Sequence, residues 1–378
     1  MAGGKLRLFA CRNGKEFASK VAFYLNKRLE EQRKKLDEDN SICEKGAGCY
    51  FYNDEIRRLV SVDVESEDSG TLEFKKFSNG EFYYKIKDED VYSVRGDKVY
   101  VIQLTESNKT INTSIHDNIF ELIVLLDMLK RSSVDEINLI LPILPYARQD
   151  VQTGREPVMT KRLSKIFEDG KLIDSLITVD VHSRAAIDNA YDLKKELLFA
   201  SKIIIPALID ELEGDTSNLV FASTDAGGTK KAKYYAKQLG VTSVVSLKER
   251  IKANYVDRLS IKGDVDGKDV CFVDDMIDTG GTLVSAIEEA FLKGARRIYA
   301  VCTHPLFNGD AFEKFEMLYN EGKLKKIVCT DTVNHSDNIL QKYKWLKQIS
   351  VAELFAEVIF CSFMKKPVSS VYKPPEKF

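Results

Sequence analysis

Two adjacent carboxylates and a glycine-threonine turn lie close together in the chain. Asp274 and Asp275 follow the apolar run Val270–Val273, and the turn Asp278–Thr282 comes shortly after them, before a helical run. Backbone N–H groups and threonine hydroxyls of such a turn, at a helix N-terminus, can bind a phosphate dianion. Carboxylates at a strand end can bind ribose hydroxyls or magnesium. A Gly-Gly turn alone is weak evidence, but the full order of strand, acids, turn and helix predicts a site for a phosphorylated sugar.

A second acid-glycine turn and a histidine are candidate metal ligands. Asp225 follows the apolar run Leu219–Ala222 and precedes two glycines, and His182 ends the run Ile177–Val181. A carboxylate and an imidazole at strand ends can serve magnesium ions that carry phosphate groups. The alternatives are a helix N-cap for Asp225 and a structural role for His182.

Three further segments carry side chains that suit a nucleotide and its phosphates. The turn Phe77–Glu81 offers an aromatic ring for a base and polar groups, Asn79 and Glu81, for its edge, although its composition is also typical of a plain hairpin turn. Arg148 offers a planar guanidinium to phosphate, or is a solvated surface charge. The cations of Lys248–Lys252 could neutralise a phosphoryl group in transfer, or form an ordinary charged loop.

Apolar segments that alternate with amphipathic segments must position these residues. The predicted strands are Leu6–Ala10, Lys98–Leu104, Ile137–Pro142, Ile177–Val181, Leu219–Ala222, Thr242–Val245, Val270–Val273, Arg297–Cys302 and Lys326–Thr330. The predicted helices include Glu16–Arg33, Ile115–Arg131, a helix that ends at Gln238, and Leu283–Leu292. This alternation, repeated in two halves, predicts parallel sheets of the doubly wound kind.

Two segments fall outside this plan. Glu31–Ser69 is highly charged at both ends and has no clear period, so we expect an inserted loop or hairpin that its aromatic residues partly order. Lys365–Phe378 is basic and contains prolines, which predicts a surface tail.

Bulk composition limits the expected partners and location. The chain has 378 residues, and its 44% hydrophobic and 30% charged content suits two or three domains. A net charge of −2 gives no broad attraction to nucleic acid or to an anionic membrane, so neither is expected. The chain lacks a signal-peptide core and a transmembrane-length segment, which favours the cytoplasm. Cys43 and Cys49 flank a glycine-containing turn but lack companions for a zinc site.

Together the motifs resemble those of the ribose-phosphate pyrophosphokinases, or phosphoribosyl diphosphate synthetases. The resemblance runs from Leu6 to about Tyr372, apart from the insertion. The matching segments are Lys75–Glu81 for the family's adenine-contacting loop, His116–Arg131 for its interface helix, Tyr146–Asp150 for its ATP-binding signature, Lys248–Arg258 for its flexible catalytic loop and Asp274–Thr282 for its ribose-5-phosphate site.

The resemblance implies an α/β fold of two doubly wound parallel-sheet domains of the type I phosphoribosyltransferase-like kind. The expected boundaries are 1–198 for the N-terminal domain, with its insertion at about 31–69, then 199–357 for the C-terminal domain and 358–378 for a C-terminal segment and tail. The implied reaction transfers the β,γ-diphosphoryl group of Mg-ATP to the anomeric 1-hydroxyl of ribose 5-phosphate, giving phosphoribosyl diphosphate and AMP. Mg²⁺ is the implied cofactor.

The resemblance also implies a role for each candidate residue. Lys248, Arg250 and His182 would be catalytic; Phe77, Asn79, Glu81, Arg148, Gln149 and Asp150 would bind ATP; Asp274 and Asp275 would bind the ribose hydroxyls; Asp278, Thr279, Gly280, Gly281 and Thr282 would bind the 5′-phosphate; and His182 and Asp225 would bind metal. The family forms homo-oligomers in which a neighbouring subunit supplies the adenine loop, so we expect an ATP site shared between subunits.

Two departures from the family pattern leave regulation and substrate open. After His182 the family has a glutamine-rich stretch that ends in paired aromatics, whereas Ser183–Asp188 has neither, which puts phosphate and ADP regulation in doubt. The insertion could reshape the site for a larger acceptor such as ADP-ribose, giving ADP-ribose pyrophosphate. Two other functions are alternatives to the diphosphokinase. A phosphoribosyltransferase would share the acid pair and its turn, and a non-catalytic regulatory homologue would resemble the enzymes but would not catalyse the reaction.

Overall fold

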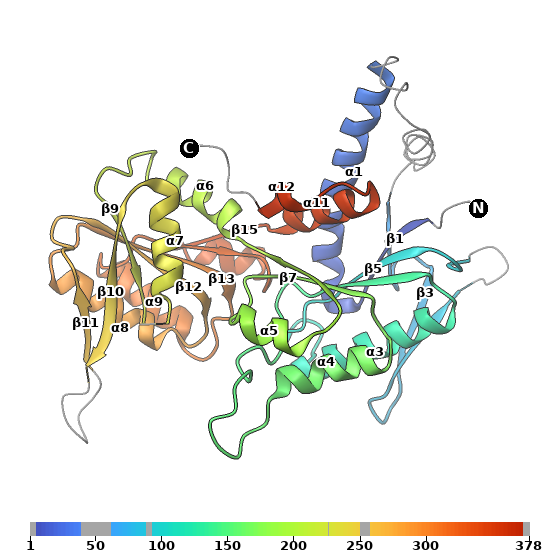
Figure 1. The fold of residues 1–378 in the computed structure, drawn as a ribbon. Coiled ribbons are helices and arrows are strands. Elements are labelled where there is room, and N and C mark those ends of the chain that lie inside the picture. The colour runs from blue at the N-terminus through green and yellow to red at the C-terminus, as the bar shows by residue number, and fades with distance from the viewer. Residues whose placement is uncertain (1–4, 39–61, 88–92, 226, 250–257, 373–378) are drawn as a thin grey trace. The chain divides into compact units, whose positions relative to one another are not determined.

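The chain folds into two compact units (Figure 1). The computed structural model describes residues 5–38, 62–87, 93–225, 227–249 and 258–372. The first unit combines Met1–Leu198 with Ala352–Tyr372, and the second unit is Phe199–Val351. Residues 352–357, which we expected in the C-terminal domain, thus belong to the first unit.

Packing between two helices explains this assignment. Helix α11 (Ala352–Phe363) lies against α1 (Lys15–Glu38), with the rings of Phe17 and Phe355 edge to face at 5.6 Å. An ion pair of 2.9 Å joins Arg28 of α1 to Glu357 of α11. Burial of the apolar face of α11 against α1 therefore ties the end of the chain to the first unit.

A six-stranded parallel sheet forms the centre of the first unit. Its strand order is β2-β1-β5-β6-β7-β8. The strands are β1 (Leu6–Ala10), β2 (Val64–Glu65), β5 (Lys98–Ile102), β6 (Glu136–Ile140), β7 (Ser175–Val179) and β8 (Lys194–Leu198). The helices are η1 (Arg12–Gly14), α1, α3 (Ile115–Arg131), α4 (Met159–Asp169), α5 (Arg184–Ala190), α11 and α12 (Ser369–Tyr372). Near-continuous apolar strands are typical of a sheet that helices cover on both faces.

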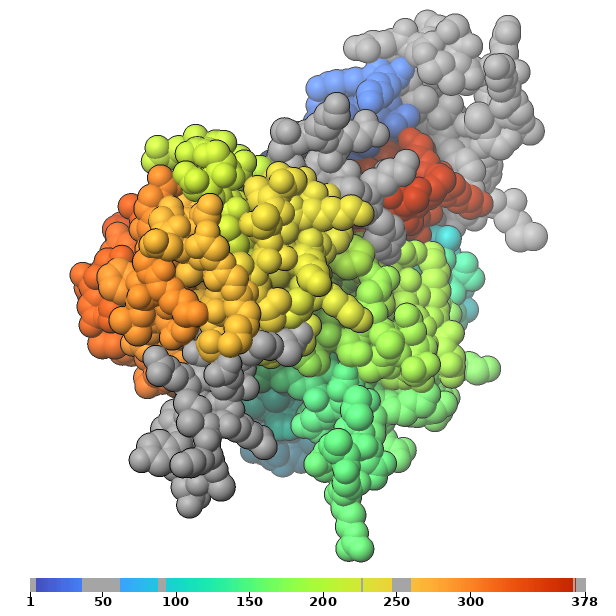
Figure 2. Space-filling model, turned by 60° about the vertical axis from the view of Figure 1, so that its left-hand side comes forward, coloured from blue at the N-terminus to red at the C-terminus, as the bar shows by residue number. Residues whose placement is uncertain are grey.

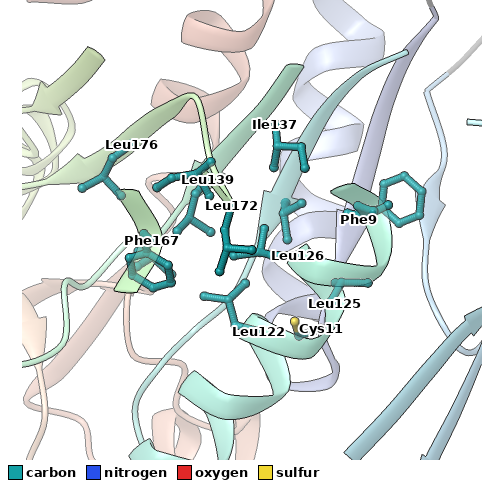
Figure 3. Close-up of a cluster of buried hydrophobic side chains, with 14 of the residues drawn as sticks. Phe9, Cys11, Leu122, Leu125, Leu126, Ile137, Leu139, Phe167, Leu172 and Leu176 are labelled. Carbon is teal, nitrogen blue, oxygen red and sulfur yellow. The ribbon is translucent and has the colours of Figure 1, made fainter. Parts of the chain in front are cut away.

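One hydrophobic core of the first unit lies between this sheet and α3. Leu122, Leu125 and Leu126 recur at helical spacing along α3 and are fully buried with sheet residues such as Phe9 and Leu139 (Figure 3). Ser114 begins α3 with a capping box in which its hydroxyl accepts from the N–H of Asp117.

A two-stranded antiparallel hairpin, β3 (Leu72–Lys76) and β4 (Phe82–Ile86), forms a separate sheet in the first unit. Its anchor is Glu121 of α3, a fully buried carboxylate. The hydroxyl of Tyr84 donates to Glu121 over 2.8 Å, and the Arg12 guanidinium donates to it over 2.8 and 3.1 Å. Arg12 also lies 4.1 Å above the ring of Phe74. The middle of the hairpin, where Phe74 pairs with Tyr84, is therefore held by charge, hydrogen bonds and an aromatic contact.

The expected insertion begins with helix rather than loop. Helix α1 continues through Glu31 to Glu38 because its residues are good helix formers with ion pairs one turn apart, such as Lys34 with Glu30 at 2.9 Å. Residues 39–61 lie outside the described part. Where description resumes, the side chain of Asn26 accepts from the N–H of Val62 over 2.8 Å and donates to its carbonyl over 3.0 Å.

A seven-stranded sheet forms the centre of the second unit, in the order β11-β10-β9-β12-β13-β14-β15. Neighbouring strands are parallel except β10 and β11, which are antiparallel. The strands are β9 (Leu219–Ser223), β10 (Thr242–Glu249), β11 (Arg258–Lys262), β12 (Asp269–Ile277), β13 (Arg297–Pro305), β14 (Lys326–Thr330) and β15 (Leu346–Ile349). The helices are α6 (Ser201–Glu211), α7 (Thr229–Leu239), α8 (Gly281–Leu292), α9 (Ala311–Asn320) and α10 (Asp337–Lys342).

The cysteines of the described residues are buried, and the described helices do not include a membrane span. Five cysteines lie there, and all are buried: Cys11, Cys271, Cys302, Cys329 and Cys361. Burial raises the pKa of the Cys271 thiol above its usual range, which makes it unreactive. Cys43 and Cys49 lie outside the described part. Among the described helices, none combines the length and apolarity that a membrane span requires.

Candidate active site

The acid pair lies inside a strand rather than after it. β12 pairs with β9 only as far as Val273, opposite Ser223, but its pairing with β13 continues to Ile277, opposite Pro305. The strand therefore runs through Asp274 and Asp275, where the prediction ended it at Val273. Because β9 has already ended at this point, the two acids lie half-buried at an edge that a ligand can approach.

Asp274 is held by two hydrogen bonds. One of its carboxylate oxygens accepts from the hydroxyl of Thr224 over 2.7 Å, and the other accepts from the backbone N–H of Asp275 over 2.9 Å. Burial, together with the hydrogen bond and negative charge of Asp275, raises the pKa of Asp274 to about 7. Near neutral pH Asp274 is therefore protonated part of the time, and hydroxyl donors or cations are the ligands that suit the two carboxylates when they are ionised.

The glycine-threonine turn leads directly into α8. Gly280 is the N-cap with φ of 74°, and among the described residues no side chain caps the helix. Thr279, Gly281 and Thr282 are exposed, and the first turn of α8 contains no acidic residue. The open N–H groups and the helix dipole therefore favour an anion at this end, as the sequence predicted for phosphate. The helix begins at Gly281 rather than Leu283, because Gly280 can adopt the left-handed conformation of the cap.

Asp225 closes the other acid-glycine turn. One of its carboxylate oxygens accepts from the N–H of Gly228 over 2.8 Å, at the start of α7. Beside this turn the hydroxyl of Ser223 is buried and has no hydrogen-bond partner among the described residues. Asp225 itself is exposed. The N-cap of α7 is Gly228 rather than Asp225, so Asp225 is not the helix N-cap that the alternative supposed. Its bond to the N–H of Gly228 occupies one of its two carboxylate oxygens.

Magnesium fits the donors that the second unit presents. Asp225, Asp274 and Asp275 offer carboxylate oxygens, the ligands that Mg²⁺ prefers. Within the described residues, no three His, Cys, Asp or Glu side chains form a metal-holding group. Mg²⁺ in phosphoryl-transfer sites is commonly bound through one or two carboxylates together with waters and substrate phosphates, and a pair such as Asp274 and Asp275 suits that role.

The candidate ATP residues of the first unit lie at its surface. Arg148 and Gln149 are exposed, and Asp150 is half-buried. Their turn is fixed from the inside, because the buried hydroxyl of Thr160 donates to the carbonyls of Tyr146, over 2.8 Å, and Gln149, over 3.2 Å. The residues that follow, 151–157, are all exposed and project from the surface (Figure 2).

The turn Phe77–Glu81 is the tip of the β3–β4 hairpin. The N–H of Phe77 donates to the carbonyl of Glu81 over 2.8 Å, so the plain hairpin turn describes its conformation correctly. Phe77, Asn79 and Glu81 are all exposed, with Phe77 50% accessible. An aromatic ring held at a hairpin tip is available to a ligand, which is what the adenine-loop prediction requires.

The three predicted catalytic residues differ in how far the structure describes them. His182 is exposed and follows β7, which ends at Val179 rather than Val181 because Asp180 takes a positive φ of 46°. The backbone of Lys248 lies in β10 opposite Leu259. The side chain of Lys248 and the whole of Arg250 lie outside the described residues.

Sequence reasoning did not identify Thr224 or Asn308. Thr224 directly precedes Asp225, and it contacts Asp274 because β9 pairs with β12. A prediction that these two parallel strands are neighbours would have indicated this contact. Asn308 donates to a carboxylate oxygen of Asp278 over 2.8 Å. Nothing in the sequence around Asn308 indicates this contact.

Comparisons with known proteins identify the family. Residues 6–169 match the family model described as the N-terminal domain of ribose phosphate pyrophosphokinase, and residues 224–373 match the phosphoribosyl synthetase-associated domain. The chain is 36% identical to a ribose-phosphate pyrophosphokinase of Wolinella succinogenes, over 85% of this chain and 95% of that one. It is 35% identical to ribose-phosphate pyrophosphokinase A of Dictyostelium discoideum, over 80% and 90% of the two chains.

A solved structure has the same fold. The phosphoribosylpyrophosphate synthetase from Mycobacterium smegmatis superposes with a TM-score of 0.74 and 25% identity, covering 96% of this chain and 99% of that one. This match confirms the predicted α/β class with its doubly wound parallel sheets. The motifs, the family models and the relatives agree: the chain belongs to the ribose-phosphate pyrophosphokinase family.

Proposed function

We propose that this protein transfers the β,γ-diphosphoryl group of Mg-ATP to the 1-hydroxyl of ribose 5-phosphate, giving phosphoribosyl diphosphate and AMP. The observation that carries the proposal is the placement of an acid pair and an uncapped helix N-terminus at the two ends of one short segment, residues 274–282. This arrangement suits a sugar with hydroxyls at one end and a phosphate at the other. The relatives that the chain matches over most of its length carry the name of this activity.

The acceptor residues all lie in the second unit. Asp274 and Asp275 accept hydrogen bonds from the ribose hydroxyls, which orients the 1-hydroxyl for attack. Backbone N–H groups at Gly281 and Thr282, with the hydroxyls of Thr279 and Thr282, hold the 5′-phosphate. Such fixed donors align the reactant, which is most of what a phosphoryl transfer requires of a protein.

The ATP residues are assigned on the resemblance. Phe77, Asn79 and Glu81 contact adenine, and Arg148, Gln149 and Asp150 contact the rest of ATP. Lys248 and Arg250 neutralise charge on the transferring group. His182 and Asp225 serve Mg²⁺, which when bound neutralises phosphate charge and favours departure of AMP. A homo-oligomer in the cytoplasm, with the adenine loop contributed to a neighbouring subunit, is part of the same proposal.

Rival functions have less support. The relatives are pyrophosphokinases of ribose phosphate, and the names of those in Wolinella succinogenes, Dictyostelium discoideum and Enterococcus faecalis do not include ADP-ribose. A phosphoribosyltransferase does not account for matches that span both units. A non-catalytic homologue would not need the acid pair, the open helix N-terminus or Lys248 and Arg250.

Measurement of AMP and phosphoribosyl diphosphate tests the proposal. The protein is incubated with ATP, Mg²⁺ and either ribose 5-phosphate or ADP-ribose, and products are separated by anion-exchange chromatography. We expect equal amounts of AMP and phosphoribosyl diphosphate with ribose 5-phosphate, and loss of both in Asp275→Asn. Absence of AMP with either acceptor would contradict the proposal, and AMP with ADP-ribose alone would reassign the substrate.

A further inference from the structure

One segment, residues 307–315, holds the last residue of β12, Ile277, and the first three residues of the phosphate turn. We call this segment the brace. The N–H of Phe307 donates to the carbonyl of Ile277 over 3.0 Å, and the N–H of Asn308 donates to that of Asp278 over 3.1 Å. The remaining two contacts involve Lys314, whose ammonium donates to the carbonyl of Thr279 over 3.5 Å, and Phe315, whose ring would lie 2.7 Å from a Cβ on Gly280. The chain therefore has a hydrogen bond to the brace at each residue from 277 to 279, and the ring of Phe315 leaves no room for a side chain at Gly280.

The brace is itself fixed by aromatic packing. Phe307 is buried with a positive φ of 44°, and its ring lies 5.1 Å from Phe312, 5.9 Å from Phe315 and 5.7 Å from Trp345. Trp345 is fully buried and donates to Glu316 over 2.8 Å. Because Phe307 is packed tightly in this aromatic cluster, the backbone of the next residue, Asn308, has little freedom to move.

Asn308 contacts Asp278 twice. Besides its backbone N–H, its side-chain amide donates to a carboxylate oxygen of Asp278 over 2.8 Å. Asp278 begins the turn that would receive a phosphate dianion, so its negative charge would oppose the ligand if the carboxylate turned toward the turn's N–H groups. The amide of Asn308 supplies a donor that keeps the carboxylate toward the brace. Two charged groups of the brace, Lys314 and Asp310, pair with each other at 2.7 Å.

We propose that Asn308 is a positioning residue for the acceptor phosphate, acting through Asp278 without touching the substrate. Asp278 then shapes the turn, and the phosphate is bound by the N–H groups and hydroxyls that follow it. The inference rests on the proposed function, because it assigns a residue to the phosphate end of that acceptor site.

Kinetics of two variants and one control test the inference. Asn308→Ala removes the amide donor, and Asn308→Asp keeps the shape but places a second carboxylate beside Asp278. The control is Asn338→Asp, the same charge change at an exposed position of α10. Loss of a hydrogen bond to a charged group predicts a KM for ribose 5-phosphate roughly tenfold higher in Asn308→Ala, and higher still in Asn308→Asp. The KM for ATP should stay unchanged in both variants, and the control should match the wild type.

Hydrogen exchange gives a second measurement that does not depend on turnover. In Asn308→Ala the amides of residues 278–282 should exchange faster, while those of β12 should not change. The inference is overturned if the KM for ribose 5-phosphate stays within about twofold of wild type, or if both KM values rise together. Inactivity of the wild-type protein with ribose 5-phosphate would instead contradict the proposed function, so the two failures are distinguishable.

Discussion

The hydroxyl of Thr224 lies 2.7 Å from a carboxylate oxygen of Asp274, so the residue that follows β9 holds an acid of β12. Because this hydrogen bond stabilises the ionised form, it lowers the pKa of Asp274 against the larger effect of burial. Thr224→Val removes the donor and keeps the shape. We expect the acid limb of the pH profile of kcat/KM for ribose 5-phosphate to shift to higher pH. A limb that is unmoved, or shifted to lower pH, would show that the bond does not control this acid.

Asp274 should also make the stability of the protein depend on pH. Its folded-state pKa of about 7 lies above the ordinary value of an aspartate, so the folded state binds more protons than the unfolded state between about pH 4 and pH 7. Stability should therefore fall as pH rises through this window, by up to about 4 kcal/mol. Urea unfolding from pH 5 to pH 8 measures this. In Asp274→Asn the decrease should be smaller, and an identical decrease in both proteins would contradict the prediction.

Gly280 and Gly281 form a matched pair for testing the turn. A Cβ at Gly280 would lie 2.7 Å from the ring of Phe315 at a φ of 74°, whereas a Cβ at Gly281 has no atom within 4 Å. Gly280→Ala should lower the free energy of unfolding by about 1–3 kcal/mol. Gly281→Ala should leave it unchanged or slightly raised, since alanine favours a helix start over glycine. Equal unfolding midpoints for the two variants would contradict the geometry of the turn.

The anchor of the hairpin can be weakened in two steps. Tyr84→Phe removes one hydrogen bond to buried Glu121 and should cost about 1–2 kcal/mol of stability. Glu121→Ala leaves Arg12 without its carboxylate and should cost about 3–5 kcal/mol. Denaturant unfolding measures both. Equal losses of unfolding free energy in the two variants would show that the ion pair between Arg12 and Glu121 adds nothing to the hydrogen bond from Tyr84.

Lys248 is the residue whose loss should separate turnover from binding. A cation that acts on the transferring group contributes in the transition state, so Lys248→Ala should lower kcat far more than it raises the KM for ATP. The exposed Lys233 of α7 provides a control, since Lys233→Ala removes the same charge elsewhere. Equal effects of Lys248→Ala on kcat and on the KM for ATP would argue against a transition-state role.

Much of the fold could be predicted because the spacing of apolar residues that indicates a strand or a helix lies within the element itself. Strands β1 and β14 and helix α3 have the predicted bounds, since each is set by its own apolar pattern and its flanking residues. β12 does not, because its last residues are kept in the sheet by β13 alone, a contact that the local pattern does not contain. The same holds for α11, whose place in the first unit depends on packing with a helix at the other end of the chain.

The parts of the site that lie in one continuous segment could be predicted from the sequence. The parts that depend on contact between two distant segments could not. The acids and the glycine turn are contiguous, so residue types and order identify them. The brace contacts join residues about thirty positions apart, such as Asn308 with Asp278. An asparagine in a loop can make many kinds of hydrogen bond, and only the folded structure shows that the partner of Asn308 is the carboxylate of Asp278.

The two hydrogen bonds between Asn26 and Val62 have a consequence for how the insertion can vary. They fix Val62 to helix α1 at Asn26, so the described residues on the two sides of positions 39–61 are held together in the first unit. The entropy of closing a chain segment between two fixed points changes only with the logarithm of its length. A change in the number of residues between Glu38 and Val62 should therefore carry a small entropic cost, which makes this a position where the length of the chain can change while the sheet of the first unit is retained.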